Sequence, residues 1–141
     1  MRKTILPLLV FSIAAILIFS SCFVIGPSLK VATLINNFEK YWEDMDANKL
    51  AGLYTEPAFV FALSRTRSQI AALYNSVFTG KTVSNFEISD KVISFNADLT
   101  GANVTFYGKV TYTNGTWTHN NYDWEVVKIG NNWYVTSSNG I

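Results

Sequence analysis

Hydrophobic residues recur every three or four positions in the segment that follows Ser28. One helical face collects Val31, Leu34, Ile35, Phe38, Tyr41, Trp42 and Met45. This spacing predicts a long amphipathic helix, with Ser28 as its N-cap. Asp46 is then expected to cap a second, shorter helix that buries Leu50 and Tyr54 and stops at Pro57, since the residue before a proline disfavours helix.

The rest of the chain contains one more helical pattern and several strand patterns. The apolar run 58–63 predicts a strand, and 64–78 predicts a third helix with its apolar positions on one side. Beyond Gly80 the alternation of apolar and polar residues predicts four strands, over 82–96, 102–113, 116–128 and 132–138. In the first of these strands the apolar phase changes near 89–91, where we expect an irregularity.

The turn between the second and third of these strands determines which side chains face inward. Asn114–Gly115 is the strongest short-range signal for a two-residue type I′ hairpin. A regular hairpin around that turn would pair Phe106 with Asp123, which mixes core and solvent positions. One extra residue near 120–121 instead pairs Phe106 with Trp124, so we predict a β-bulge there.

The bulged register predicts a concave sheet face that is rich in aromatic residues. Its inner positions are Val104, Phe106, Gly108, Val110, Tyr112, Trp117, His119, Tyr122, Trp124, Val126, Trp133 and Val135. The outer face carries Thr, Asn and Lys residues together with Tyr107 and Tyr134. We therefore expect an α+β domain in which a curved, mostly antiparallel sheet wraps around the N-terminal helices.

The first 22 residues have the pattern of a secretory signal. Arg2 and Lys3 precede an apolar run over 5–19, and Ser20 and Ser21 lead to Cys22, the only cysteine. The last three residues resemble a bacterial lipobox, which implies cleavage before Cys22 and its lipidation. An uncleaved helix over 5–25 is just long enough to span a bilayer, and an ordinary cleaved signal is the third alternative.

Each alternative places the remaining chain outside the cytoplasm, and we expect a membrane-anchored protein of the bacterial cell envelope. The expected organisation is a signal peptide over 1–21, a lipid-bearing tether over 22–28 and one domain over 29–141. Removal of Arg2 and Lys3 leaves nine basic and ten acidic residues. This balance, without a basic cluster, argues against nucleic acid as a partner. Since no second cysteine exists, the domain is expected to fold without a disulfide.

Three segments together resemble the nuclear-transport-factor-2-like superfamily, which includes ketosteroid isomerases and SnoaL-type cyclases. They are the second-helix segment 46–58, the third-helix segment 67–74 and the closing hairpin 124–133. The resemblance implies a cone-shaped, cystatin-like domain that commonly encloses a pocket and often dimerises. In the ketosteroid isomerases the general base and the oxyanion donor match Ala62 and Phe38 here. Both positions are apolar, so we expect no isomerase chemistry.

Several functions remain open at this stage. The residues expected to line a pocket are Phe38, Tyr41, Trp42, Tyr54, Phe59, Phe61, Phe106, Tyr112, His119, Tyr122, Trp124 and Trp133. The first interpretation is a non-catalytic lipoprotein that binds a small apolar ligand or a protein partner, with a homodimer formed through the outer sheet face. The alternative is an enzyme in which His119 and a pocket tyrosine transfer protons on a small carbonyl compound. A third possibility is a scaffold with a filled cone. No metal or cofactor is expected, because too few His, Cys and inward carboxylates are available.

Overall fold

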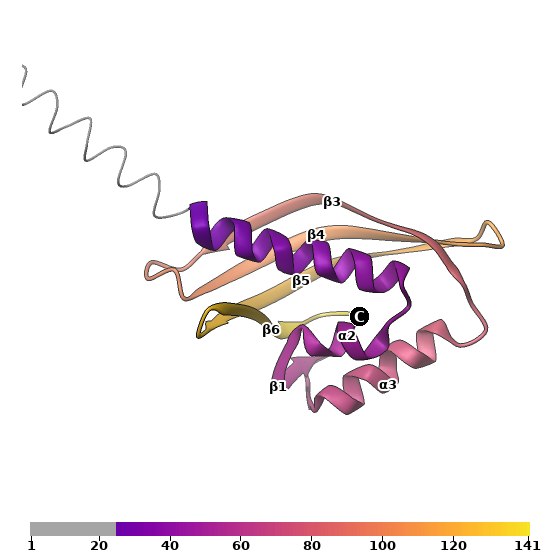
Figure 1. Cartoon of the computed structure of the whole chain (residues 1–141), viewed down its shortest axis with the longest axis horizontal. Helices are drawn as coiled ribbons and strands as arrows, with labels where there is room; N and C mark the ends of the chain where they lie inside the picture. Colours follow the sequence, from indigo (N-terminus) through magenta and orange to yellow (C-terminus); the bar gives the residue numbers. More distant parts are fainter. Residues whose placement is uncertain (1–24) are drawn as a thin grey trace, which may run out of the picture.

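The computed structural model describes residues 25–141 and contains one curved six-stranded sheet with a long helix lying along it (Figure 1). The N-terminal helix covers residues 25–43. It is followed by α2 (Ala47–Gly52), β1 (Tyr54–Val60), β2 (Leu63–Arg65), α3 (Arg67–Phe78), β3 (Val83–Phe95), β4 (Gly101–Tyr112), β5 (Trp117–Ile129) and β6 (Asn132–Ser138). The strand order is β2-β1-β6-β5-β4-β3, and only β1 and β6 are parallel. The expected fold class is confirmed.

The N-terminal helix buries the face that its sequence periodicity predicts. Val31, Ile35 and Phe38 are fully buried against the inner side of the sheet. Residues 25–28, which were expected to form a tether and a cap, are already helical. This is compatible with Pro27, because its ring fixes φ near the helical value. The predicted signal segment and Cys22 lie outside the described residues.

The two following helices begin at side chains that satisfy free backbone N–H groups. Asp46 accepts a hydrogen bond from the Lys49 backbone N–H at the start of α2, as expected. In α3, Thr66 and Gln69 form a reciprocal capping box, so this helix begins three residues later than predicted. Among residues 25–141, no helix is both long and apolar enough to cross a bilayer.

The segment between α2 and α3 differs from its prediction. Tyr54 begins β1 instead of ending a helix, and Pro57 lies within that strand. The strand can accept a proline because its pairing with β6 is interrupted between Tyr54 and Phe59. β1 then turns at Phe61 and Ala62, which both have positive φ, into the short edge strand β2.

The long hairpins confirm one predicted irregularity and overturn the other. The β3–β4 register shifts between Ser89 and Val92, where a phase change was expected. In the β4–β5 hairpin, however, the pairing runs without a shift from Gly101 to Thr111, so the predicted bulge near 120–121 is wrong.

The length of the β4–β5 turn explains the observed register. The Gly115 N–H donates to the Tyr112 carbonyl, and the Tyr112 N–H donates to the Thr116 carbonyl. The loop therefore has three residues with Gly115 in the left-handed region, and Phe106 pairs with Tyr122 rather than with Trp124.

Candidate functional site

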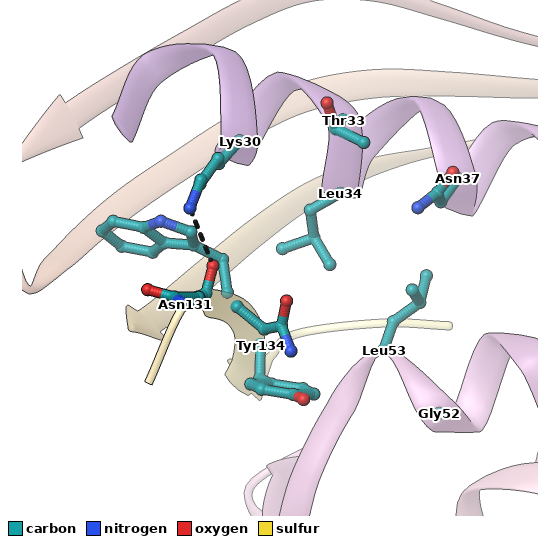
Figure 2. Close-up of a pocket in the computed structure, with 10 residues that line it drawn as sticks. Lys30, Thr33, Leu34, Asn37, Gly52, Leu53, Asn131 and Tyr134 are labelled. Carbon is teal, nitrogen blue, oxygen red and sulfur yellow. Dashed lines mark hydrogen bonds between the residues drawn. The ribbon is translucent and has the colours of Figure 1, made fainter. Parts of the chain in front are cut away.

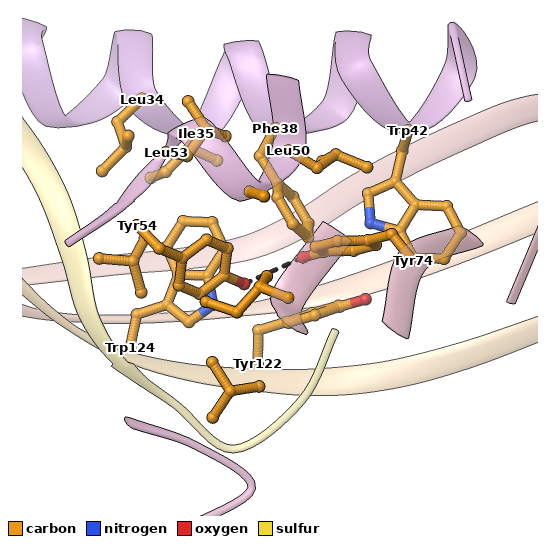
Figure 3. Packing of buried hydrophobic residues seen from close by; sticks show 14 of the residues in the cluster. Leu34, Ile35, Phe38, Trp42, Leu50, Leu53, Tyr54, Tyr74, Tyr122 and Trp124 are labelled. Carbon is orange, nitrogen blue, oxygen red and sulfur yellow. Dashed lines mark hydrogen bonds between the residues drawn. The ribbon is translucent and has the colours of Figure 1, made fainter. Parts of the chain in front are cut away.

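The interior of the cone, where a pocket was expected, is filled by interlocking aromatic rings (Figure 3). Phe38 points from the N-terminal helix into the centre, and it is fully buried. Its ring centroid lies 4.8 Å from that of Trp124 and 5.3 Å from that of Tyr122, both edge to face. Such perpendicular contacts are the favoured packing of aromatic pairs. The centre of the cone is thus a packed core.

Two buried tyrosines form a hydrogen bond within this core. The hydroxyl oxygens of Tyr54 and Tyr74 lie 2.9 Å apart in a hydrogen bond (Figure 3). Burial raises the pKa of Tyr54 to about 12 and also raises the pKa of Tyr74. The pKa of the neighbouring Tyr122 is raised by burial as well. All three phenols therefore stay neutral near pH 7.

A small hollow remains at the mouth of the cone, beside the β4–β5 strands. It has a volume of about 170 Å³ and lies among Trp42, Phe86 and Tyr122, and the predicted pocket residues Tyr112 and His119 also contribute to its rim. The Tyr122 and Phe86 rings pack directly against the Gly108 backbone. A Cβ at position 108 would lie 2.7 Å from Tyr122 Cε2 and 2.9 Å from Phe86 Cζ. Small-molecule sites usually have roughly 300–1,000 Å³. This hollow is too small for such a ligand.

A larger groove lies on the surface, between the N-terminal helix and the β5–β6 turn (Figure 2). Its volume is about 410 Å³. Lys30 on the helix donates from Nζ to the Asn131 carbonyl at 3.0 Å and closes one end. Thr33, Asn37 and Tyr134 add further polar atoms to the walls. The exposed lining of this groove is somewhat more apolar than polar, but the groove is open to solvent, whereas small-molecule sites bury most of their ligand's surface.

His119 and Trp117 lie on the outer face of the sheet, contrary to the predicted inward orientation. The unbulged β5 register turns their side chains outward and places even-numbered residues such as Tyr122 inward. The His119 ring stacks on Tyr107 at a centroid distance of 5.3 Å and contacts the tilted Trp117 ring at 5.6 Å. Lys109 Nζ lies 5.4 Å from the Trp117 ring centroid. We call Tyr107, Lys109, Trp117 and His119 the outer aromatic strip.

The remaining predicted pocket residues divide into core and surface. Buried in the core are Phe38, Trp42, Tyr54, Phe106, Tyr112, Tyr122, Trp124 and Trp133. Tyr41 is half-buried. Phe59 and Phe61 are exposed and were wrongly placed inside, because the strand in which they were expected ends in a turn at the edge of the sheet.

The positions that carry chemistry in ketosteroid isomerases offer none here. Phe38 is an apolar ring at the centre of the core, and Ala62 lies in the exposed β1–β2 turn. The exposed His119 contacts aromatic rings rather than a carboxylate that could orient it. Within residues 25–141, no cluster of His, Cys, Asp and Glu could hold a metal ion.

Comparison with known proteins establishes the fold. No protein-family model and no curated protein matches the sequence. A protein of unknown function with a cystatin-like fold, from Nostoc punctiforme, superposes with a TM-score of 0.63 and 16% identity over 79% of this chain and 86% of that chain. The fold is cystatin-like.

Two further solved structures superpose on this chain. Kfla4162 from Kribbella flavida superposes with a TM-score of 0.66 and 13% identity over 79% of this chain and 86% of that chain. Aln2 from a Streptomyces species gives the same TM-score, identity and coverage. The superpositions confirm the cystatin-like fold that the resemblance implied. At such low identity they carry no information about activity, because one fold hosts many functions.

Proposed function

We propose that this chain is a non-catalytic lipoprotein of the bacterial cell envelope, anchored through Cys22, whose cystatin-like domain binds a protein partner. The filled interior of the cone carries this proposal. Phe38 occupies the centre, and the hollow that remains at the mouth has a volume of only about 170 Å³. A small apolar ligand would need roughly twice that volume or more. We therefore place binding on the outer surface of the domain.

The outer face of the sheet is the surface best suited to a partner, and a second copy of the chain fits it. Trp117 in the outer aromatic strip is 55% exposed. The same face carries both charge signs, with Lys109 on β4 and with Asp123 and Glu125 on β5. A two-fold dimer places the same patch on both sides, so a face with both signs can match itself.

Sedimentation velocity of residues 25–141 tests the dimer. We expect a dimer for the unchanged domain and monomers for Trp117→Asp and Tyr107→Asp, since each change puts a charge into the interface. Leu29→Asp is the matched control, because this exposed apolar residue lies on the N-terminal helix, away from the outer face. A monomeric unchanged domain, or a dimer that survives both Asp substitutions, contradicts the proposed interface.

Metabolic labelling of the full chain with a radioactive fatty acid tests the anchor. We expect Cys22→Ala to abolish the label, because the thiol is the group that carries the lipid. Ser21→Ala is the control that should keep the label, since a lipobox accepts Ala at that position. Equal labelling of both variants contradicts lipidation at Cys22, and absence of label from the unchanged chain does so as well.

A further inference from the structure

Three large apolar side chains project from the β1–β2 hairpin into solvent. Phe59, Phe61 and Leu63 are 56%, 48% and 57% exposed, and we call them the apolar tip. Their strands lie at one end of the sheet, where β2 is the edge strand. Contiguous exposed apolar side chains usually mark a surface that binds a protein or a membrane.

The side chains of the apolar tip lie on both faces of the β1–β2 hairpin. Leu63 pairs with Val60, whose side chain points into the core, so Leu63 lies on the inner side of the sheet. Phe59 is the next residue along the strand and therefore points to the opposite side. Phe61 forms the apex of the turn. A flat protein surface would cover one of these sides, whereas a fluid apolar medium surrounds all of them.

The turn itself is built from residues that disfavour its conformation. Phe61 and Ala62 have φ of 52° and 59°, the left-handed region in which Asn and Gly are usual. The Phe61 N–H donates to the Ser138 carbonyl at 3.1 Å and fixes the turn on the sheet. An aromatic ring is thus held at the apex at a cost to the backbone, which points to a role for the ring itself.

Arg65 lies behind the tip on β2, whereas Arg67, at the start of α3, lies near the opposite end of β1, with its guanidinium carbon 5.9 Å from the Tyr134 ring centroid. Arg65 donates from Nε to the Val60 carbonyl at 3.2 Å, and Arg67 donates from Nε to the Tyr54 carbonyl at 3.0 Å. Within residues 25–141 neither forms an ion pair with a carboxylate. The remaining guanidinium donors of Arg65 match the geometry of phosphate oxygens.

We propose that the apolar tip inserts into the headgroup–acyl boundary of a bilayer that contains anionic lipid, with Arg65 on the lipid phosphates. Apolar side chains of interfacial elements reach about 5–10 Å into this boundary, and adjacent basic residues add attraction to anionic lipid. The inference rests on the proposed membrane anchor, which brings the domain to the surface. The tip is then a second contact that orients the domain.

Photo-crosslinking of the full chain in bacterial cells tests this contact. The photoreactive residue p-benzoylphenylalanine replaces Phe61 in one variant and Val92 in a matched control, which is 57% exposed but lies on β3 at the opposite edge of the sheet. After irradiation, membrane and soluble fractions are separated and adducts are identified by mass. We expect phospholipid adducts at position 61 in roughly tenfold excess over position 92, and a lower yield when Arg65→Glu is added.

Each other outcome overturns the inference in a distinguishable way. A membrane-bound chain with no lipid adduct at position 61, or with equal yields at both positions, rejects the tip contact and leaves the anchor intact. A protein adduct at position 61 assigns the tip to a protein partner. A chain recovered in the soluble fraction contradicts the anchor and this inference together.

Discussion

Gly108 shows how tightly single residues control the filled interior. A Cβ at this position would lie within 3 Å of the Tyr122 and Phe86 rings, which are themselves held by Phe38. We therefore expect Gly108→Ala to lower the free energy of unfolding by about 1–3 kcal/mol, the usual cost of overpacking. Urea unfolding followed by tryptophan fluorescence measures this change.

Gly52→Ala is the matched control for that substitution. A Cβ on Gly52 meets nothing within 4 Å, and the residue closes α2. Alanine there is expected to leave the stability unchanged or raise it by up to about 1 kcal/mol, because it favours helix. If both variants were equally stable, the close approach at Gly108 would be refuted.

The buried tyrosines make stability depend on alkaline pH. An exposed tyrosine in the unfolded chain titrates near pKa 10, while burial raises the pKa of Tyr54 to about 12 and also raises that of Tyr74. Above pH 10 the unfolded state loses protons that the folded state retains. Stability is therefore fully present below that pH and falls as pH rises towards 12.

Urea unfolding between about pH 8 and about pH 11 measures this dependence. Tyr54→Phe is expected to reduce the alkaline slope, because it removes one phenol with a raised pKa. The control is Val92→Ala, at an exposed position without a titratable group, which should keep the slope of the unchanged domain. A slope that is the same with and without the Tyr54 hydroxyl would contradict its burial as a neutral group.

At the scale of elements, the β1–β2 turn is the place where local conformation and sequence disagree. Ala62 has φ of 59°, a conformation that costs a non-glycine residue about 1–2 kcal/mol. We expect Ala62→Gly to raise the melting temperature, with a net gain of about 1 kcal/mol in the free energy of unfolding. Ala72→Gly, on the exposed side of α3, should lose about 1 kcal/mol. A loss of stability in both variants would show that the turn is unstrained.

Helices and strands followed from the sequence because their apolar periods are long and regular. The β4–β5 turn did not, since Asn114–Gly115 suits both a two-residue and a three-residue loop, and both place Gly115 at positive φ. The length of the loop decides whether the odd-numbered or the even-numbered residues of β5 face inward. A two-residue loop pairs Trp117 and His119 with inward positions of β4, whereas the observed three-residue loop turns the even-numbered series that contains Tyr122 and Trp124 inward without a bulge.

At the scale of the whole molecule, the cone could be predicted and its contents could not. The residues expected around a pocket are mostly the ones that fill it, because the volume enclosed by a curved sheet depends on ring orientations that no periodicity encodes. The exposed tip escaped prediction for a related reason. The run 58–63 has no polar residue to mark the turn, so Phe59 and Phe61 resembled core residues.

Native mass spectrometry of purified residues 25–141 tests the central claim, that the cone is filled and the domain binds by its surface. We expect the mass of the bare polypeptide, alone or doubled in a dimer, with no retained molecule. A stoichiometric adduct of a few hundred daltons, lost only on unfolding, would contradict the filled interior and restore a ligand pocket to the cone.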